Sequence, residues 1–242
     1  MKKLSGISGF LLAYNEEENI EKAVLALVAA LKANAARYEA MVVLYEKSTD
    51  NTASIVRKLA KNNSHVRLVM QPCSRKGYGN AIRIGIEHAR CPYIFFSDAD
   101  NQFDFRDIGK LARYADSYQI VTGYRTDRKD PFVRRLTARI YNTLLKLIFP
   151  IPVKDIDCAF KLYQKDIFRN MELVCTTGMV NAEIITKAAI KKAAIKEVPI
   201  PHYHRFAGRP VFEANKWAII KPKVVMDLLK EMKVLWKTMP RR

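Results

Sequence analysis

Two carboxylates one residue apart, Asp98 and Asp100, follow the apolar residues 93–96, which stand behind Pro92. A run of bulky apolar residues in this setting predicts a short buried strand. Side chains at positions i and i+2 of an extended segment point the same way, so the two carboxylates can converge on one ligand. Mg²⁺ commonly binds one or two carboxylates and completes its coordination with water and substrate phosphate. The pair therefore predicts a divalent-cation site, although a solvated acidic turn has the same composition.

A second candidate site is the glycine pair Gly77 and Gly79, beside Lys76 and at the start of a predicted helix. Glycines allow backbone N–H groups to approach an anion at a helix N-terminus. The pair does not belong to a P-loop, because GxxxxGK[ST] is absent, and no GxGxxG follows the first predicted strand. By itself the glycine pair is weak evidence for an anion site, because such a pair is more often an ordinary loop or cap.

The hydrophobic pattern predicts the scaffold that positions these residues. Apolar runs predict strands over residues 7–13, 40–44, 66–70 and 93–98, with helices between them that end near residues 36, 61 and 88. Asn15, followed by three glutamates, is the expected N-cap of the first helix. This alternation predicts an α/β fold with a doubly wound, mostly parallel sheet. Such sheets bind ligands beyond the carboxyl ends of their strands, where both candidate sites fall.

The second half of the chain continues with mixed elements. Helices are expected over residues 105–115, 132–149 and 180–192, strands over 119–123, 159–163 and 195–200, and a charged loop over 125–131. A last helix begins at Pro222, where proline suits the first helical position. Its apolar stripe and its lysines fit a helix packed on the core, or one lying in a membrane interface.

The charge balance predicts an anionic partner. The chain of 242 residues carries a net charge of +18, and residues 191–242 hold 13 Lys or Arg against 4 Asp or Glu. Nucleic acid, a phosphorylated ligand and an anionic membrane are all compatible with this charge, but no nucleic-acid-binding motif has the required spacing. The four cysteines form no CxxC pair, which favours reduced thiols. No apolar run is long enough to span a bilayer.

Taken together, these segments resemble family 2 glycosyltransferases with the GT-A fold, in particular those that act on polyprenyl phosphates such as dolichyl or bactoprenyl phosphate. The segments that carry the resemblance are Ala13-Tyr14-Asn15-Glu16-Glu17, Ser48-Thr49-Asp50-Asn51-Thr52, Lys76-Gly77-x-Gly79, Asp98-Ala99-Asp100-Asn101-Gln102, Gly123-Tyr124-Arg125 and Asp155-Ile156-Asp157-Cys158-Ala159-Phe160-Lys161. Their order and spacing together are more specific than any one of them.

The resemblance implies transfer of a sugar from a nucleoside-diphosphate donor to the phosphate of a polyprenyl lipid. It assigns donor binding to Ala13, Tyr14, Glu16, Glu46, Lys76, Asp98 and Arg205. It assigns Mg²⁺ or Mn²⁺ to Asp98 and Asp100, with Gln102 as a third member. It assigns the acceptor side to Asp157, Arg125, Arg135 and Arg139. A lipid phosphate is already anionic, so Asp157 is expected to orient a reactant rather than to act as a base.

The same resemblance implies a catalytic domain over residues 1–212 and a basic amphipathic helix within 213–242 that associates with the cytoplasmic face of a membrane. One departure from the family pattern is Tyr45-Glu46-Lys47, where two acidic residues and a glycine are usual. The alternatives are therefore a soluble family 2 enzyme with a saccharide or protein acceptor, which would need Asp157 as an activated base, and a nucleotide-sugar-binding protein with impaired catalysis.

Overall fold

The structure is a computed structural model, and it describes residues 2–126, 132–205, 207 and 222–239; the side chains of residues 132–135, 137 and 222–225 lie outside this description. Its strands are β1 (Ile7–Ala13), β2 (Tyr38–Tyr45), β3 (Val66–Gln71), β4 (Tyr93–Asp98), β5 (Ile120–Thr126), β6 (Phe160–Gln164) and β7 (Ile195–Pro201). Its α-helices are α1 (Ile20–Asn34), α2 (Thr52–Asn62), α3 (Tyr78–His88), α4 (Ile108–Ala112), α5 (Phe132–Ile148), α6 (Val180–Ile190) and α7 (Pro222–Thr238). Short 3₁₀ turns cover Cys73–Arg75, Phe105–Asp107 and Lys165–Phe168.

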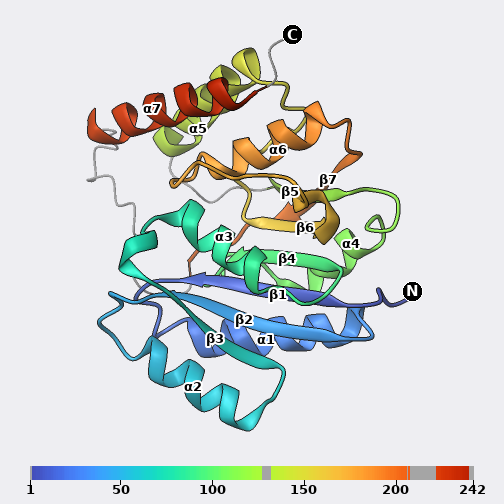
Figure 1. The fold of residues 1–242 in the computed structure, drawn as a ribbon. Coiled ribbons are helices and arrows are strands. Elements are labelled where there is room, and N and C mark those ends of the chain that lie inside the picture. The colour runs from blue at the N-terminus through green and yellow to red at the C-terminus, as the bar shows by residue number, and fades with distance from the viewer. Residues whose placement is uncertain (1, 127–131, 206, 208–221, 240–242) are drawn as a thin grey trace.

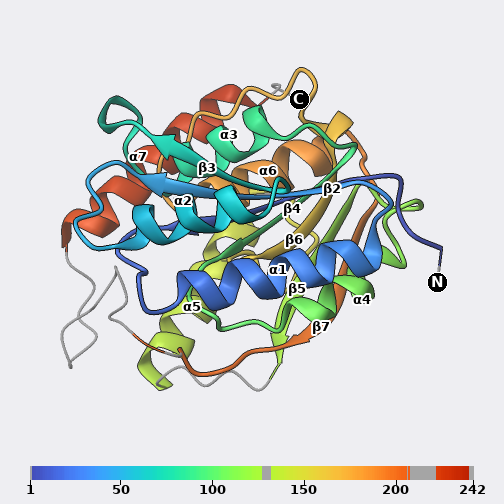
Figure 2. The same ribbon diagram turned by 90° about the horizontal axis from the view of Figure 1, so that it is seen from below.

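The strands form one seven-stranded sheet in the order β3-β2-β1-β4-β6-β5-β7. Only β6 runs antiparallel to its neighbours, β4 and β5, and the other pairings are parallel. Helices α1, α2 and α4 cover one face, while α3 and α6 cover the other (Figures 1 and 2). The predicted α/β class with a doubly wound, mostly parallel sheet is confirmed.

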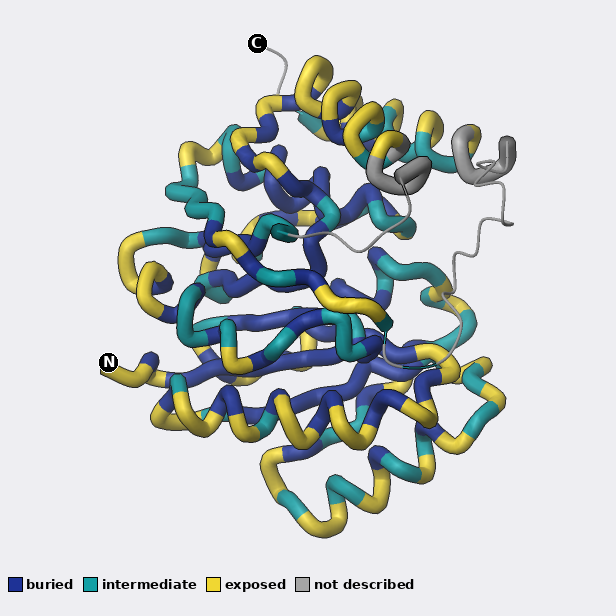
Figure 3. The backbone as a smooth tube through the Cα atoms, turned by 180° about the vertical axis from the view of Figure 1, so that it is seen from behind, coloured by how far each residue is buried: buried dark blue, intermediate teal, exposed yellow. Residues whose placement is uncertain are grey.

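The central strands are mostly apolar because helices bury both of their faces. Every residue of β1 is buried, and so are the six inner residues of β2. Figure 3 shows this core as a continuous buried band between the exposed sides of the helices. The sheet is therefore a rigid platform, and its carboxyl edge can hold side chains in fixed positions.

Three local predictions differ from the structure. Asn15 is not the N-cap of α1, which begins at Ile20 behind Asn19; the backbone of Asn15 instead takes the left-handed conformation, with a φ of 53°. Arg125 is not in a charged loop, because it lies in β5, where its side chain is paired. The rest of the predicted loop, residues 127–131, lies outside the described residues. The predicted helix over 105–115 is shorter, with a 3₁₀ turn followed by α4.

Candidate active site

The segments with candidate site residues meet at one edge of the sheet. Strands β1, β2, β3 and β4 are mutually parallel, and β5 and β7 run in the same direction because β4 and β5 are both antiparallel to β6. The carboxyl ends of all six strands therefore lie at this edge, which is also where β6 begins. This is the position at which open α/β sheets bind their ligands.

The first two family-like segments are joined by hydrogen bonds between their loops. The Asn15 side chain accepts from the Thr49 N–H at 2.8 Å, and the Asn15 N–H donates to Ser48 Oγ at 2.9 Å. Next to them, the Glu16 N–H donates to Thr52 Oγ1 at 2.9 Å. These bonds explain why Asn15 does not cap a helix, since its amide oxygen serves the neighbouring loop.

Glu16 is the centre of a buried polar cluster. It is only 6% exposed, accepts from Asn19 Nδ2 at 2.7 Å and pairs with the guanidinium of Arg205. A second nitrogen of Arg205 lies 3.5 Å from Asp100 Oδ2. Burial raises the pKa of Glu16, although Asn19 and Arg205 act in the opposite direction. Three predicted site residues, distant in sequence, are thus brought together.

Asp98 and Asp100 lie close enough for their charges to interact, but the expected extended segment does not reach Asp100, because β4 ends at Asp98 and residues 99 and 100 form a bend. Burial, and after it the neighbouring charge of Asp100, raises the pKa of Asp98 to about 7. Tyr78 donates its hydroxyl to Asp98 Oδ1 at 3.2 Å, and the ammonium of Lys161 opposes the shift. Two carboxylates that disfavour each other's charge form a site that a divalent cation would stabilise.

The donor set fits Mg²⁺ or Mn²⁺ only if the substrate completes it. Among the described residues, no three His, Cys, Asp or Glu side chains lie close enough to hold a metal by themselves. Two carboxylates, substrate phosphate and water are the usual environment of Mg²⁺. Gln102 lies beside the pair: its N–H donates to Asp100 Oδ1 at 3.2 Å, and its side-chain Nε2 donates to the Tyr203 carbonyl at 3.2 Å. The amide oxygen of Gln102 is the atom suited to a cation.

The glycine pair has a packing reason that the sequence did not indicate. Gly77 has a φ of 109°, and a Cβ there would lie 2.4 Å from the Thr176 carbonyl oxygen. A Cβ on Gly79 would lie 2.3 Å from the Cys175 carbonyl oxygen, and its N–H already donates to Thr176 at 2.8 Å. The glycines therefore admit a neighbouring backbone segment. Lys76 is exposed beside them, and its role as a partner of the donor diphosphate stays a prediction.

Arg125 and Asp155 form an ion pair whose two side chains are each 11% exposed. Arg125 donates from Nε to Oδ2 and from Nη2 to Oδ1, both at 2.7 Å, and its N–H also reaches Oδ2 at 3.1 Å. The Nε–Nη2 edge of the guanidinium is thus bonded to Asp155, and the pair fixes the segment before β6. Phosphate binding by Arg125 stays a prediction.

Asp157 lies two residues further along that segment and is partly buried. Its charge reaches Tyr78, Tyr141 and Lys161, because it contributes to the pKa shift of each. Helix α5 also contacts this segment directly, since Asn142 Oδ1 accepts from the Ile156 N–H at 3.2 Å. Asp157 therefore lies between the Asp98 region and α5.

The two other arginines of the predicted acceptor side lie on α5. Arg139 is exposed there, and the side chain of Arg135 lies outside the described residues.

The surface expected to contact the nucleoside of the donor is aromatic. The rings of Tyr14 and Tyr45 lie 5.8 Å apart, Glu46 is exposed next to them, and Ala13 is buried at the end of β1. Burial and its neighbour Cys73 raise the pKa of Tyr45, so its hydroxyl stays neutral. A surface of this kind can stack a base on one side and accept a hydrogen bond through Glu46.

Sequence reasoning missed Tyr78 and Lys161 as members of the site. Lys161 is fully buried and donates to the carbonyls of Ile156, at 3.0 Å, and Cys158. A lysine inside an otherwise apolar strand is a signal for such a role, because a buried ammonium requires several acceptors. Tyr78, the residue between the two glycines, gives no comparable signal.

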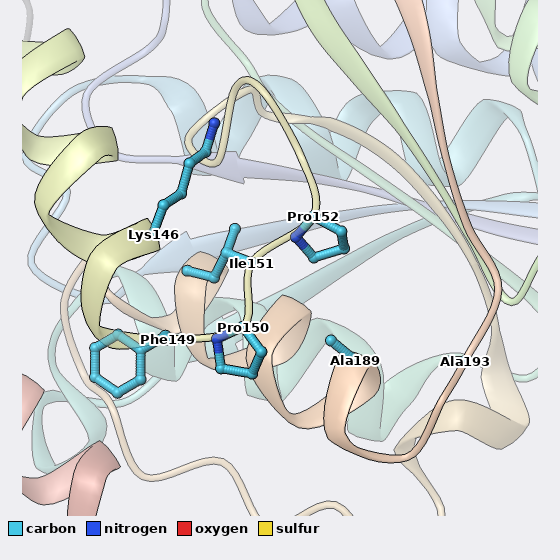
Figure 4. A pocket seen from close by; sticks show the side chains of 7 residues that line it. All are labelled: Lys146, Phe149, Pro150, Ile151, Pro152, Ala189 and Ala193. Atoms are coloured by element: carbon cyan, nitrogen blue, oxygen red, sulfur yellow. The ribbon is translucent and has the colours of Figure 1, made fainter.

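Two surface features lie on the α5 side of the molecule. A groove of about 510 Å³ between the ends of α5 and α6 is lined by Lys146, Phe149, Pro150, Ile151, Pro152, Ala189 and Ala193 (Figure 4), and no predicted site residue lines it. Helices α5 and α7 lie at the same end of the molecule, and Phe149 meets Trp236 with ring centroids 6.3 Å apart (Figure 1). In the part of the chain that the structure describes, no helix is both long and apolar enough to cross a membrane.

A seven-stranded α/β sheet with an acid pair at its carboxyl edge is the architecture of a GT-A glycosyltransferase. The family model of glycosyl transferase family 2 matches residues 10–171. The chain therefore belongs to glycosyl transferase family 2 and is a glycosyltransferase.

Similar proteins agree with this assignment and with the resemblance to the polyprenyl-phosphate enzymes. The chain is 25% identical to an undecaprenyl-phosphate 4-deoxy-4-formamido-L-arabinose transferase of Edwardsiella ictaluri, over 100% of the chain and 71% of the relative. It is 27% identical to a dolichyl-phosphate beta-glucosyltransferase of Trichomonas vaginalis, over 80% of the chain and 64% of that relative.

The fold also matches a solved structure, glucosyl-3-phosphoglycerate synthase from Mycobacterium tuberculosis in complex with Mn²⁺, UDP and glucosyl-3-phosphoglycerate. The TM-score is 0.71 at 19% identity, over 95% of the chain and 80% of the synthase. This likeness confirms the GT-A fold.

Proposed function

We propose that this glycosyltransferase transfers a sugar from a nucleoside diphosphate to a polyprenyl phosphate at the cytoplasmic face of a membrane. The observation that carries the proposal is the apolar and basic surface of α5 and α7. Helix α5 also contacts the segment that contains Asp157, so this surface lies next to the acceptor side of the site. Large exposed apolar side chains on these helices are Leu136, Ile140, Leu144, Leu147, Ile148, Met226, Leu229, Val234 and Trp236.

Leu147 is 78% exposed and Trp236 is 57% exposed, so core packing does not account for them. The exposed cations Arg139, Lys146, Lys230, Lys233 and Lys237 accompany them on the same helices. Apolar residues next to Lys and Arg favour a helix in a membrane interface, where each cation contributes about 1 kcal/mol near anionic lipid. Core packing accounts for the other face of α7, where Leu235 is fully buried and Leu228 and Met232 are half-buried against the core. We assign the catalytic domain to residues 1–212 and membrane contact to 213–242; this boundary lies outside the described residues.

On the donor side, Tyr14, Ala13 and Glu46 would hold the nucleoside, and Lys76 and Arg205 would bring positive charge to the diphosphate. A Mg²⁺ or Mn²⁺ ion bound by Asp98 and Asp100, with Gln102, would neutralise the diphosphate as it leaves. Arg205 now pairs with Glu16 and lies near Asp100, and this keeps its guanidinium at the position where diphosphate charge would appear.

On the acceptor side, the lipid phosphate is already an anion, so positioning contributes more than deprotonation. Asp157 would orient the sugar or the acceptor, and the pair Arg125–Asp155 would keep its segment in place. Arg139 and Arg135 on α5 would bind the acceptor phosphate, because Arg forks match phosphate oxygens.

The catalytic part is tested with a thermal-shift panel of UDP-, GDP- and other nucleotide sugars with Mn²⁺, followed by transfer to a short polyprenyl phosphate. Selective binding of one donor raises the melting temperature, and Asp100→Ala should abolish transfer. Transfer to a free saccharide with no transfer to the lipid phosphate would support the soluble alternative. Donor binding without any transfer would support the impaired-catalysis alternative.

The membrane part is tested by sedimentation with phosphatidylglycerol vesicles. Changing Lys230, Lys233 and Lys237 to Glu should abolish sedimentation. The matched control changes Arg57, Lys58 and Lys61 to Glu, because these exposed cations lie on α2 at the other side of the molecule (Figure 1). Equal loss in both triple variants would refute a specific role of α7.

A further inference from the structure

The segment 174–177 is held by carboxylates from two helices. On the α6 side, Glu183 is fully buried and accepts from the N–H groups of Val174, at 2.8 Å, and Cys175, at 2.9 Å. Lys187 pairs with the same carboxylate at 2.6 Å. Helix α6 thus fixes the first half of the segment as part of the core.

Glu231 of α7 binds the second half. Its Oε1 accepts from the Thr176 N–H at 2.7 Å and from Thr176 Oγ1 at 2.8 Å. The Thr177 N–H donates to the same carboxylate at 3.2 Å, and the Thr177 hydroxyl also donates to it. Hydrogen bonds to an ionised carboxylate are the strong ones, so this single side chain ties α7 to the segment.

The other side of the segment touches the glycine loop of the active site. The Thr176 carbonyl accepts from the Gly79 N–H at 2.8 Å, and both Gly77 and Gly79 lie too close to this backbone to admit a Cβ. Between the glycines, Tyr78 donates to Asp98 at 3.2 Å. A continuous series of contacts therefore leads from Glu231 through Thr176 and the glycine loop to Asp98.

Helix α7 packs on the core along one face and is exposed on the other. Leu235 is fully buried, Leu228 and Met232 are half-buried against the core, and Trp236 meets Phe149, but most of the other described side chains are exposed. The helix with the exposed apolar and basic surface is thus the one that carries Glu231. A change in how α7 is seated would therefore act on Thr176 and Thr177 through Glu231.

We propose that Glu231 is a positioning residue that couples the seating of α7 on a lipid surface to the geometry of the glycine loop and Asp98. Docking of α7 on anionic lipid holds Glu231 against Thr176, which orders the Gly79 amide and the Tyr78 hydroxyl. The enzyme then binds its donor best where its acceptor is present. The lipid trigger rests on the proposed function, whereas the contact between Glu231 and the glycine loop does not.

The first test is hydrogen–deuterium exchange of the Gly79 amide in the full chain without ligands. Glu231→Ala removes the hydrogen bonds that this carboxylate accepts from residues 176 and 177, and we expect about tenfold faster exchange at Gly79. Glu231→Gln keeps a carbonyl acceptor and should restore part of the protection. The matched control is Asp227→Asn, which removes one negative charge from the same helix but has no hydrogen bond to these residues. Exchange unchanged by Glu231→Ala, with the fold intact by urea unfolding, would overturn the proposal.

The second test adds phosphatidylglycerol vesicles to the same measurement. Vesicles should slow exchange at Gly79 at least threefold in the unmodified protein and leave Glu231→Ala unaffected, although this variant still sediments with the vesicles. A purely structural contact would give no response to vesicles, and that result would overturn the coupling. Failure of the unmodified protein to sediment would instead refute the membrane part of the proposed function, and with it the lipid trigger, while faster exchange in Glu231→Ala would still identify Glu231 as a positioning residue.

Discussion

The pair Arg125–Asp155 provides the sharpest test of the site's construction. Asp155→Ala removes the acceptor of three N–H donors of Arg125, all within 3.1 Å, and leaves the guanidinium buried without its partner. Breaking a buried pair in this way costs roughly 3–5 kcal/mol of unfolding free energy. Because both side chains retain some exposure, we expect about 3 kcal/mol. For a domain of this size, that loss lowers the melting temperature by roughly 6–12 °C.

The assay is a double-mutant cycle in which the stability of each variant is measured by urea unfolding. Asp155→Ala and Arg125→Met should each destabilise the protein, and the double variant should lose less than the sum, with a coupling energy of about 2 kcal/mol. The exposed pair Arg75–Glu87, whose side chains are 37% and 50% exposed, is the control, and Glu87→Ala should change stability by less than about 1 kcal/mol. Additive effects of Asp155→Ala and Arg125→Met would refute the conclusion that these two side chains stabilise the fold as a pair. If Arg125→Lys left stability unchanged and raised the KM for the acceptor, Arg125 would instead be assigned to binding of the acceptor phosphate.

Three further predictions concern other parts of the fold. Burial would raise the pKa of Glu39, but hydrogen bonds from Ser8, Arg90 and Arg67 outweigh it and hold the pKa below 4.5. The contribution of Glu39 to stability should therefore be constant above pH 4.5 and fall as the pH drops through the folded-state pKa. Glu39→Gln should flatten this dependence in urea unfolding measured between pH 6 and about 3. Gly79→Ala would place a Cβ 2.3 Å from a backbone oxygen and should cost about 1–3 kcal/mol in urea unfolding. Asp157→Asn should retain measurable transfer to a lipid phosphate, because no base is needed; complete loss of kcat with unchanged donor binding would indicate general-base catalysis.

Local patterns predicted the sheet and the acid pair for identifiable reasons. β1 has the predicted bounds, and β4 ends at Asp98 as expected, because apolar runs flanked by polar residues mark buried strands. The two-residue repeat of an extended segment does not account for the proximity of Asp98 and Asp100, because β4 ends at Asp98 and residues 99 and 100 form a bend. Asn15 failed as an N-cap because its side chain bonds to a loop 33 residues away in the chain, and such a partner leaves no trace in the local sequence.

The alternation of strands and helices, the position of the acid pair at a strand end and the resemblance to a glycosyltransferase family thus follow from the sequence, because periodicity and motif spacing are properties of neighbouring residues. The order of the strands in the sheet, with β6 antiparallel, comes from the tertiary structure. The partners of the charged side chains do not. Only the tertiary structure pairs Arg125 with Asp155, Arg205 with Glu16, and Glu231 with Thr176, because a buried charge takes whatever complementary group the fold places beside it.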